Sequence, residues 1–331
     1  MTTGVKSYNG TLGVTQGANI RDCATAKTNG TTSLWEIAED AGMATGVIST
    51  ARITHATPAA TYAETTERDW ESDKDVSAEG KAKGCVDIAA QFVAWQAAHG
   101  KGFDVAMGGG RTNFIPNTMA DPEYANVKGN RADGRNLVDE WKAAAPNRTF
   151  VTDKAGFDAF NWNSDGQILG LFEPSHMQYD LDRAKDGKGE PTIADMTKAA
   201  ITRLSRNPKG YVMMVEGGRV DHGLHAGDAQ HALGDAAALD EAIATAVAMT
   251  DPKDTLIIVT ADHSHTLIIQ GYPDRGNPIL GLVKENGKLT MARDGKPYTT
   301  LSFANGPGSV CTKQPDDKIG RASCRERVSS P

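Results

Sequence analysis

The sequence lacks the features that mark membrane proteins, nucleic-acid-binding proteins and disordered chains. It contains no run of about 18 apolar residues, so it predicts no transmembrane helix or visible membrane anchor. Its net charge of −7 is spread along the chain without a basic block, which argues against a nucleic-acid or anionic membrane partner. Repeats and low-complexity linkers are also missing. Because 39% of the 331 residues are hydrophobic, we expect one large α/β domain with a smaller insertion.

Both ends of the chain look unlike the ends of a natural domain. Residues 1–10 show none of the features of a leader and resemble the interior of a domain. Residues 318–331 become abruptly basic and lose all periodicity, so we interpret them as a translated non-coding or cloning-derived scar.

Strand-like and helix-like segments alternate through most of the chain. Short apolar runs predict strands at residues 44–49, 103–107, 168–172, 211–215 and 254–260. Periodic apolar positions predict helices at 32–41, 84–95, 137–141, 192–206 and 231–249, and Thr192 with Asp195 forms a cap-like start. This alternation predicts an α/β fold with a mostly parallel central sheet and helices on both faces. Residues 271–278 break the pattern and belong to a loop-and-hairpin insertion.

Two of the predicted strands end on carboxylates and imidazoles. The strand 211–215 leads into Glu216, and Asp221 and His225 follow at a four-residue interval that puts both on one face of a helix. The strand 254–260 leads into a similar group, Asp262, His263 and His265. Chemistry gathers at the carboxyl ends of strands in open α/β sheets, and such donors suit zinc-like ions. The alternative is that Asp and His simply favour strand ends and helix caps.

Two further strand ends carry residues of interest. The strand 44–49 runs on to His55 and Thr57. The strand 103–107 closes on the triplet Gly108–Gly110, which either cradles an anion or provides a tight exit from the strand.

Several short motifs follow one another along the chain. They are Thr-Gly-Val-Lys-x-Tyr-Asn-Gly (3–10), His-Ala-Thr-Pro-Ala (55–59), Arg-Asp-Trp (68–70), Phe-Glu-Pro (172–174), Val-Glu-Gly-Gly-Arg-Val-Asp-His-Gly (215–223), Thr-Ala-Asp-His-Ser-His (260–265) and Ala-Asn-Gly-Pro-Gly (304–308). In this order they resemble the alkaline phosphatase family, specifically its animal-like branch. The resemblance implies a core at 1–265 that is incomplete at its N-terminus, a crown-like insertion at 266–310 and a non-native-looking tail at 311–331.

The resemblance implies a set of metal ligands and catalytic residues. One zinc would bind to Asp221 and His225, a second zinc to Asp262 and His263, and a magnesium ion to Thr57 and Glu216. Arg68 would grip two oxygens of the substrate phosphate with its guanidinium fork, a geometry that lysine cannot supply. Without the motif, the ordinary reading of Arg68 is a surface ion pair. His55 and His222 would lie around the metals and tune metal and phosphate binding.

Two further features resemble the animal enzymes. Their extra calcium site matches Glu123, the carbonyl of Phe172, Glu173 and Glu190, and oxygen ligands suit that hard cation. Glu190 stands where the pattern has Asp, in a loop of different length. Cys23 and Cys85 resemble a disulfide pair of the same branch, which implies the periplasm or the cell exterior. Cys311 and Cys324 carry no argument.

The family also has residues for which this sequence offers no match. Its nucleophilic serine and an aspartate that bridges zinc and magnesium precede the motif at 3–10, and a third zinc histidine follows the motif at 304–308. We therefore interpret the chain as an internal fragment of an enzyme that hydrolyses phosphomonoesters through a phosphoserine, a homodimer at full length. The alternatives are a metal- or phosphate-binding pseudoenzyme, or a sulfatase-like or phosphodiesterase-like member of the superfamily.

Overall fold

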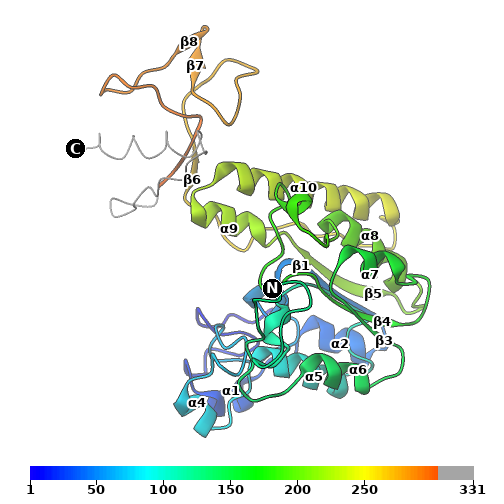
Figure 1. The fold of residues 1–331 in the computed structure, drawn as a ribbon. Coiled ribbons are helices and arrows are strands. Elements are labelled where there is room, and N and C mark those ends of the chain that lie inside the picture. Colours follow the sequence, from blue (N-terminus) through cyan, green and yellow to red (C-terminus); the bar gives the residue numbers. More distant parts are fainter. Residues whose placement is uncertain (305–331) are drawn as a thin grey trace. The chain divides into compact units, whose positions relative to one another are not determined.

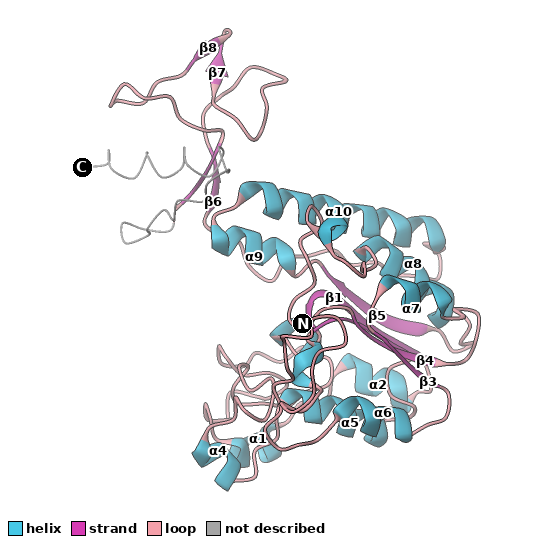
Figure 2. Cartoon of the chain, in the orientation of Figure 1, coloured by secondary structure: helices cyan, strands magenta, loops and turns pink. Residues whose placement is uncertain are grey.

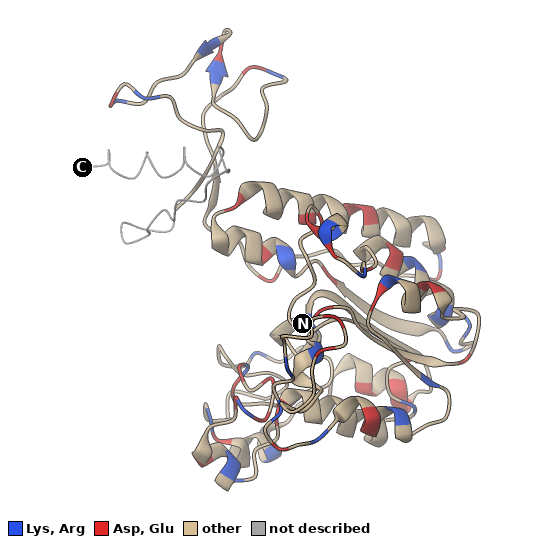
Figure 3. Ribbon diagram, in the orientation of Figure 1, with Lys and Arg blue, Asp and Glu red and all other residues tan. Residues whose placement is uncertain are grey.

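The computed structural model describes residues 1–304, which fall into two compact units. Unit 1 contains residues 1–218 and 238–255, and unit 2 contains residues 219–237 and 256–304. Figure 1 labels their helices and strands. Figure 3 shows that acidic and basic residues are interspersed along these elements. No helix of the described chain is long and apolar enough to cross a bilayer.

A five-stranded sheet forms the centre of unit 1, with the strand order β3-β4-β2-β1-β5. Its strands are β1 (Ala44–Arg52), β2 (Val105–Gly109), β3 (Arg148–Val151), β4 (Gln167–Leu171) and β5 (Tyr211–Glu216). All neighbours are parallel, and the register places Ser49 of β1 opposite Glu216 of β5. β1 and β2 are buried almost throughout, as expected for parallel strands covered on both faces.

Helices cover both faces of this sheet, as Figure 2 shows. On one face Val47 of β1 joins a core with α2 (Leu34–Asp40), α5 (Ile88–Ala98) and α6 (Leu137–Ala143). On the other, Ile48 joins a core with α7 (Lys154–Ala159), α8 (Ile193–Leu204) and the second half of α10 (Ala229–Met249). Successive strand residues thus point to opposite cores. The predicted fold class, a mostly parallel sheet between helices, is confirmed.

Side-chain caps decide where the helices of unit 1 begin. The Thr192 hydroxyl accepts from the Asp195 N–H and the Asp195 carboxylate accepts from the Thr192 N–H, so the predicted cap of α8 is confirmed. α5 begins at Ile88 and not at residue 84, because the Asp87 carboxylate accepts the Ala90 N–H and so caps the first turn.

The sequence analysis did not predict the remaining short elements of unit 1, although it singled out His55 and Thr57, which lie at α3. They are α1 (Cys23–Asn29), α3 (Ala56–Ala59), α4 (Ala78–Ala82) and the short 3-10 helices Arg111–Asn113 and Arg183–Lys185. β3 and α7 were also missed. The predicted Cys23–Cys85 disulfide is confirmed, with the Cα atoms 5.5 Å apart. In the chain-entropy model, closing a loop of this length stabilises the fold by about 4 kcal/mol.

Unit 2 has a small core of its own. α9 (Arg219–Ala226) packs on the start of α10, where a Cβ added to Gly223 would lie 2.7 Å from the Ala232 nitrogen. Two antiparallel pairs, β6 (Leu267–Ile269) with β9 (Leu301–Phe303) and β7 (Lys284–Glu285) with β8 (Lys288–Leu289), lie where the loop-and-hairpin insertion was predicted. The predicted tail at 311–331, with Cys311 and Cys324, lies outside the described residues.

The predicted strand at 254–260 is wrong. The segment forms no strand in the structure, and its apolar side chains are exposed, with Leu256 at 83% and Ile258 at 75%. An apolar run becomes a strand only when its backbone finds a ladder partner. Within the described chain this segment pairs with no strand, so its composition alone was misleading.

Candidate metal and phosphate sites

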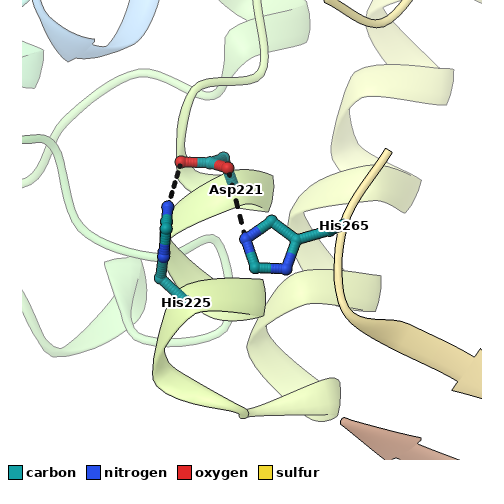
Figure 4. A group of neighbouring side chains, drawn as sticks. All are labelled: Asp221, His225 and His265. Atoms are coloured by element: carbon teal, nitrogen blue, oxygen red, sulfur yellow. Dashed lines mark ion pairs between the residues drawn. The ribbon is translucent and has the colours of Figure 1, made fainter. Parts of the chain in front are cut away.

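Unit 2 brings together one carboxylate and two imidazoles, which we call the Asp-His group: Asp221, His225 and His265 (Figure 4). Asp221 and His225 lie one turn apart on α9, with Nε2 of His225 3.5 Å from Oδ2 of Asp221. His265 comes from the segment before β6, and its Nε2 lies 3.6 Å from Oδ1 of Asp221. The three ligand atoms lie within 4.8 Å of one another, and Oδ1 of Asp221 is buried without a hydrogen-bond partner. This donor set fits zinc.

The second predicted zinc pair is arranged differently. Nε2 of His263 lies 3.3 Å from Oδ2 of Asp262, and the two side chains are 56% and 69% exposed. The ring centroid of His263 is 6.4 Å from that of His265. His265, which the sequence motif contains without an assigned role, is therefore the imidazole that completes the Asp-His group. His222 contacts Arg219, whose Nη1 lies 3.1 Å from its Nδ1.

Arg68 and His55 lie together in unit 1. Nη2 of Arg68 is 3.5 Å from Nε2 of His55, the N-cap residue of α3. The Arg68 N–H donates to the Gly10 carbonyl at 2.8 Å and holds the residue's backbone in place. Among residues 1–304, Arg68 forms no ion pair with a carboxylate, so the surface ion-pair reading of this arginine finds no support.

Glu71 fastens the segment after Arg68 to the end of β1. Its carboxylate accepts from Nε and Nη2 of Arg52 at 2.7 and 2.6 Å, from the Thr54 hydroxyl at 2.6 Å and from Nδ2 of Asn113 at 3.2 Å. Burial raises the pKa of Glu71, but hydrogen bonds and the charge of Arg52 outweigh it and hold the pKa below its usual value. Glu71 thus positions the loop that carries Arg68, a role that no local pattern indicates.

Thr57 and Glu216, the predicted magnesium ligands, come from neighbouring elements of unit 1. Thr57 is half-buried on α3, which lies next to the ends of β1 and β5. Glu216 is the last residue of β5, and its Oε2 accepts a short hydrogen bond from the Ser49 hydroxyl of β1. The Ser49 contact follows from the strand register, which sequence spacing does not reveal.

A set of buried acids lies elsewhere in unit 1, and we call it the carboxylate cluster: Glu123, Glu173, Asp186 and Glu190. One oxygen from each of the first three lies within 4.8 Å of the others. Burial, Glu173 and Asp186 raise the pKa of Glu190 to about 9. Burial and the adjacent Asp186 raise the pKa of Glu123 to about 7. Because like charges 4 Å apart repel by about 4 kcal/mol at an effective dielectric of 20, the cluster requires protons or a cation.

The cluster has fewer hydrogen-bond donors than oxygens. Arg111 is fully buried and forks onto Asp121 at 2.7 and 2.8 Å, with one further contact to Glu123 at 3.1 Å. Gln178 donates to Glu173 at 2.9 Å and to Glu190 at 3.0 Å. Three buried oxygens have no donor within residues 1–304: Oε1 of Glu123, Oδ2 of Asp186 and Oε2 of Glu190. An all-oxygen set with orphaned buried oxygens fits calcium.

The glycine triplet helps to build this cluster. A Cβ at Gly109 would lie 2.0 Å from the Ser175 carbonyl oxygen, and Gly110 has a φ of +97°. The Gly110 N–H donates to the carbonyls of Glu173 and Ser175, at 3.1 and 2.6 Å. The triplet is therefore a tight strand exit, and it holds the loop of Glu173 against the end of β2. Phe172, the buried residue before Glu173, stays a predicted carbonyl ligand.

Asp186 was missed by the sequence analysis. The loop before Glu190 differs in length from the family pattern, so no motif pointed to it. Its repeated acids, Asp180, Asp182 and Asp186, were the available signal.

Comparison with known proteins identifies the family. The alkaline phosphatase family model matches residues 1–327. The chain belongs to the alkaline phosphatase family. The tissue-nonspecific alkaline phosphatases of Felis catus and Homo sapiens are 41% and 40% identical to it over 312 residues, which is 92% of this chain and 57% of theirs. The chain thus spans little more than half the length of these alkaline phosphatases.

Solved alkaline phosphatases share the fold. The Thermus thermophilus enzyme is 28% identical, with a TM-score of 0.55 over 75% of this chain and 42% of that one. The cold-active enzyme of a Shewanella species is 26% identical, with a TM-score of 0.54 over 75% of this chain and 48% of that one. The predicted alkaline phosphatase-like architecture is confirmed.

Proposed function

We propose that this chain supplies the phosphate-gripping and much of the metal-binding part of an enzyme that hydrolyses phosphomonoesters. The observation that carries the proposal is Arg68, which stands beside His55 without a carboxylate partner in residues 1–304. An arginine fork left unpaired in this way suits two oxygens of a phosphate. Membership of the alkaline phosphatase family supports this reading.

The proposed metals are two zinc ions and one magnesium ion. Asp221 and His225 would hold one zinc, with His265 beside them as a third donor; Asp262 and His263 would hold the second, and Thr57 and Glu216 the magnesium. When bound, such ions lower the pKa of a hydroxyl or water and neutralise charge on the leaving oxygen. Calcium would bind at Glu123, the Phe172 carbonyl, Glu173 and Glu190.

The protein's own groups would orient the substrate. Arg68 would hold two phosphate oxygens in line for displacement, and Glu71 would keep its loop fixed through Arg52 and Thr54. His55 and His222 would adjust phosphate and metal affinity from the surroundings of the site. We assign the nucleophilic serine and its phosphoserine to the longer protein, because no residue of the printed sequence matches that motif.

The Cys23–Cys85 bridge supports an oxidising compartment, so we propose the periplasm or the cell exterior. The longer protein would act as a homodimer.

Turnover of p-nitrophenyl phosphate at alkaline pH tests the proposal. The printed chain should show no more than a metal-ion background, because loss of a nucleophile costs about a millionfold. A chain extended at both ends to the length of its relatives should be active with zinc. In that longer chain Arg68→Ala should lower kcat/KM about 100- to 1000-fold, as loss of a transition-state donor does. Arg135→Ala, which breaks only a surface pair with Glu140, is the matched control.

Two outcomes would overturn the assignment. Zinc-dependent turnover by the printed chain that Arg68→Ala abolishes would show that the nucleophile lies within it. An extended chain that binds phosphate and metals without turnover would be a pseudoenzyme.

A further inference from the structure

The loop that carries Asp186 is tied to the segment that carries Glu123. Nζ of Lys188 donates to the Pro122 carbonyl at 3.0 Å, and the Tyr124 hydroxyl lies 3.5 Å from Oδ1 of Asp186. The Asp186 N–H donates to the Arg183 carbonyl at 3.2 Å, which closes the turn before it. Asp186 is therefore held toward Glu123 by contacts on both sides of it in sequence.

Carboxylate oxygens of Glu190 and Asp186 could each bind a cation. Glu190 is 2% exposed, yet in the described part of the chain its Oε2 has no donor, and Oδ2 of Asp186 is buried without one as well. The buried guanidinium of Arg111 already donates to both oxygens of Asp121 and to Oε2 of Glu123. Buried carboxylate oxygens without donors are costly unless a cation meets them.

We propose that Asp186 is a direct ligand of a cation at this cluster, so that the ion is held by four carboxylates: Glu123, Glu173, Asp186 and Glu190. The inference rests on the proposed calcium site and adds to it a ligand that the family resemblance does not contain. Four anionic oxygen donors select hard cations of high charge, which are calcium and trivalent lanthanides. Magnesium is a poor fit because it demands a tight octahedron and keeps several waters.

Calcium titration of the whole printed chain, followed by calorimetry, tests the role of Asp186. Asp186→Asn should weaken calcium binding by about tenfold or more, since even residues that only orient a ligand cost 10- to 100-fold. Asp182→Asn is the matched control: it makes the same change in the same loop, but that carboxylate pairs with Nζ of Lys185 at 2.6 Å. Terbium luminescence sensitised by Tyr124, which contacts Glu173 at 3.2 Å, provides a second probe and should fall in the same order.

A thermal melt in chelator separates a ligand from a structural residue. If Asp186 is a ligand, Asp186→Asn removes one repelling carboxylate, so its melting temperature should equal or exceed that of the wild type, and the increase caused by calcium should shrink. Wild-type calcium affinity in Asp186→Asn, with or without a lower melting temperature, would overturn the proposal.

A failure of the calcium site as a whole is distinguished from a failure of the Asp186 proposal by the wild-type chain. A wild-type chain that binds neither calcium nor terbium would refute the calcium site and Asp186 with it. The phosphatase proposal depends on turnover by the extended chain and would stand or fall separately.

Discussion

The carboxylate cluster and the Asp-His group differ in how the chain assembles them. The Asp-His group takes two of its three members from one turn of α9, and its His225 side chain is 70% exposed. The carboxylate cluster draws on distant segments, and Glu123 and Glu190 are almost completely buried. The helical pair Asp221 and His225 can therefore be recognised in the sequence and is partly exposed. The carboxylate cluster forms only on folding, and its buried like charges repel one another without a cation.

This difference predicts different responses to mutation. Within the Asp-His group, His225 is 70% and Asp221 37% exposed, so solvent screens part of the charge and changes there should affect metal affinity more than stability. The charges of the carboxylate cluster are desolvated, so a change there should affect the free energy of unfolding directly.

The largest effect is expected when the buried arginine of the cluster is removed. Arg111→Met leaves Asp121 and Glu123 without their cation, so the free energy of unfolding in chelator should fall by about 3–5 kcal/mol. Arg135→Met, which breaks the exposed pair with Glu140, should cost less than about 1 kcal/mol. Urea unfolding of both variants makes the measurement. Equal losses would show that burial does not distinguish the two ion pairs.

Glu39, a buried acid outside the carboxylate cluster, tests whether burial alone is sufficient to raise the pKa of a carboxyl group. Burial raises the pKa of Glu39 to about 7, although its carboxylate accepts hydrogen bonds from the Thr45 hydroxyl and the Lys101 N–H. The folded protein therefore holds this proton more tightly than the unfolded chain. The stabilisation is complete below the usual pKa of about 4.5 and is lost as the pH rises through 7.

Comparison with Glu39→Gln isolates this effect. Between pH 4.5 and pH 8, the wild type should lose about 3 kcal/mol more unfolding free energy than the variant, at 1.36 kcal/mol per pKa unit. Calcium should not change the difference, because Glu39 is not a member of the carboxylate cluster; its acidic neighbour is Asp104. Parallel pH profiles for the two proteins would contradict the prediction.

The smallest effect is expected at two histidines of unit 2, His265, whose side chain is 11% exposed, and His263, whose side chain is 56% exposed. His265→Ala should weaken zinc binding to the chain by about tenfold, because it removes one of three donors that lie within 4.8 Å of each other. His263→Ala should weaken it less at this group, since its ring lies 6.4 Å from that of His265. Competition with a chromogenic zinc chelator measures both. If His263→Ala has the larger effect, the predicted pair Asp262 and His263 is the stronger zinc site.

Local sequence patterns predicted the structure correctly where the interacting residues are close together in the sequence. The Thr192–Asp195 cap of α8 and the one-turn spacing of Asp221 and His225 follow from helix geometry alone. The buried strands β1, β2 and β4 follow from apolar runs, since parallel strands covered on both faces need apolar side chains throughout, and the half-buried β5 follows from a similar run. The Cys23–Cys85 pair followed from family motifs and not from spacing.

Tertiary structure decided whatever depends on a partner far away in the chain. Ser49 meets Glu216 only through the strand register, His265 meets Asp221 only through the fold of unit 2, and Asp186 meets Glu123 only through its loop. Residues 254–260 show the converse: they pair with no strand among residues 1–304, and their apolar run stays irregular. The sequence alone determined which segments could bury apolar surface and where helices could begin. Which side chains meet depends on how segments far apart in the sequence pack together, and no local pattern records that.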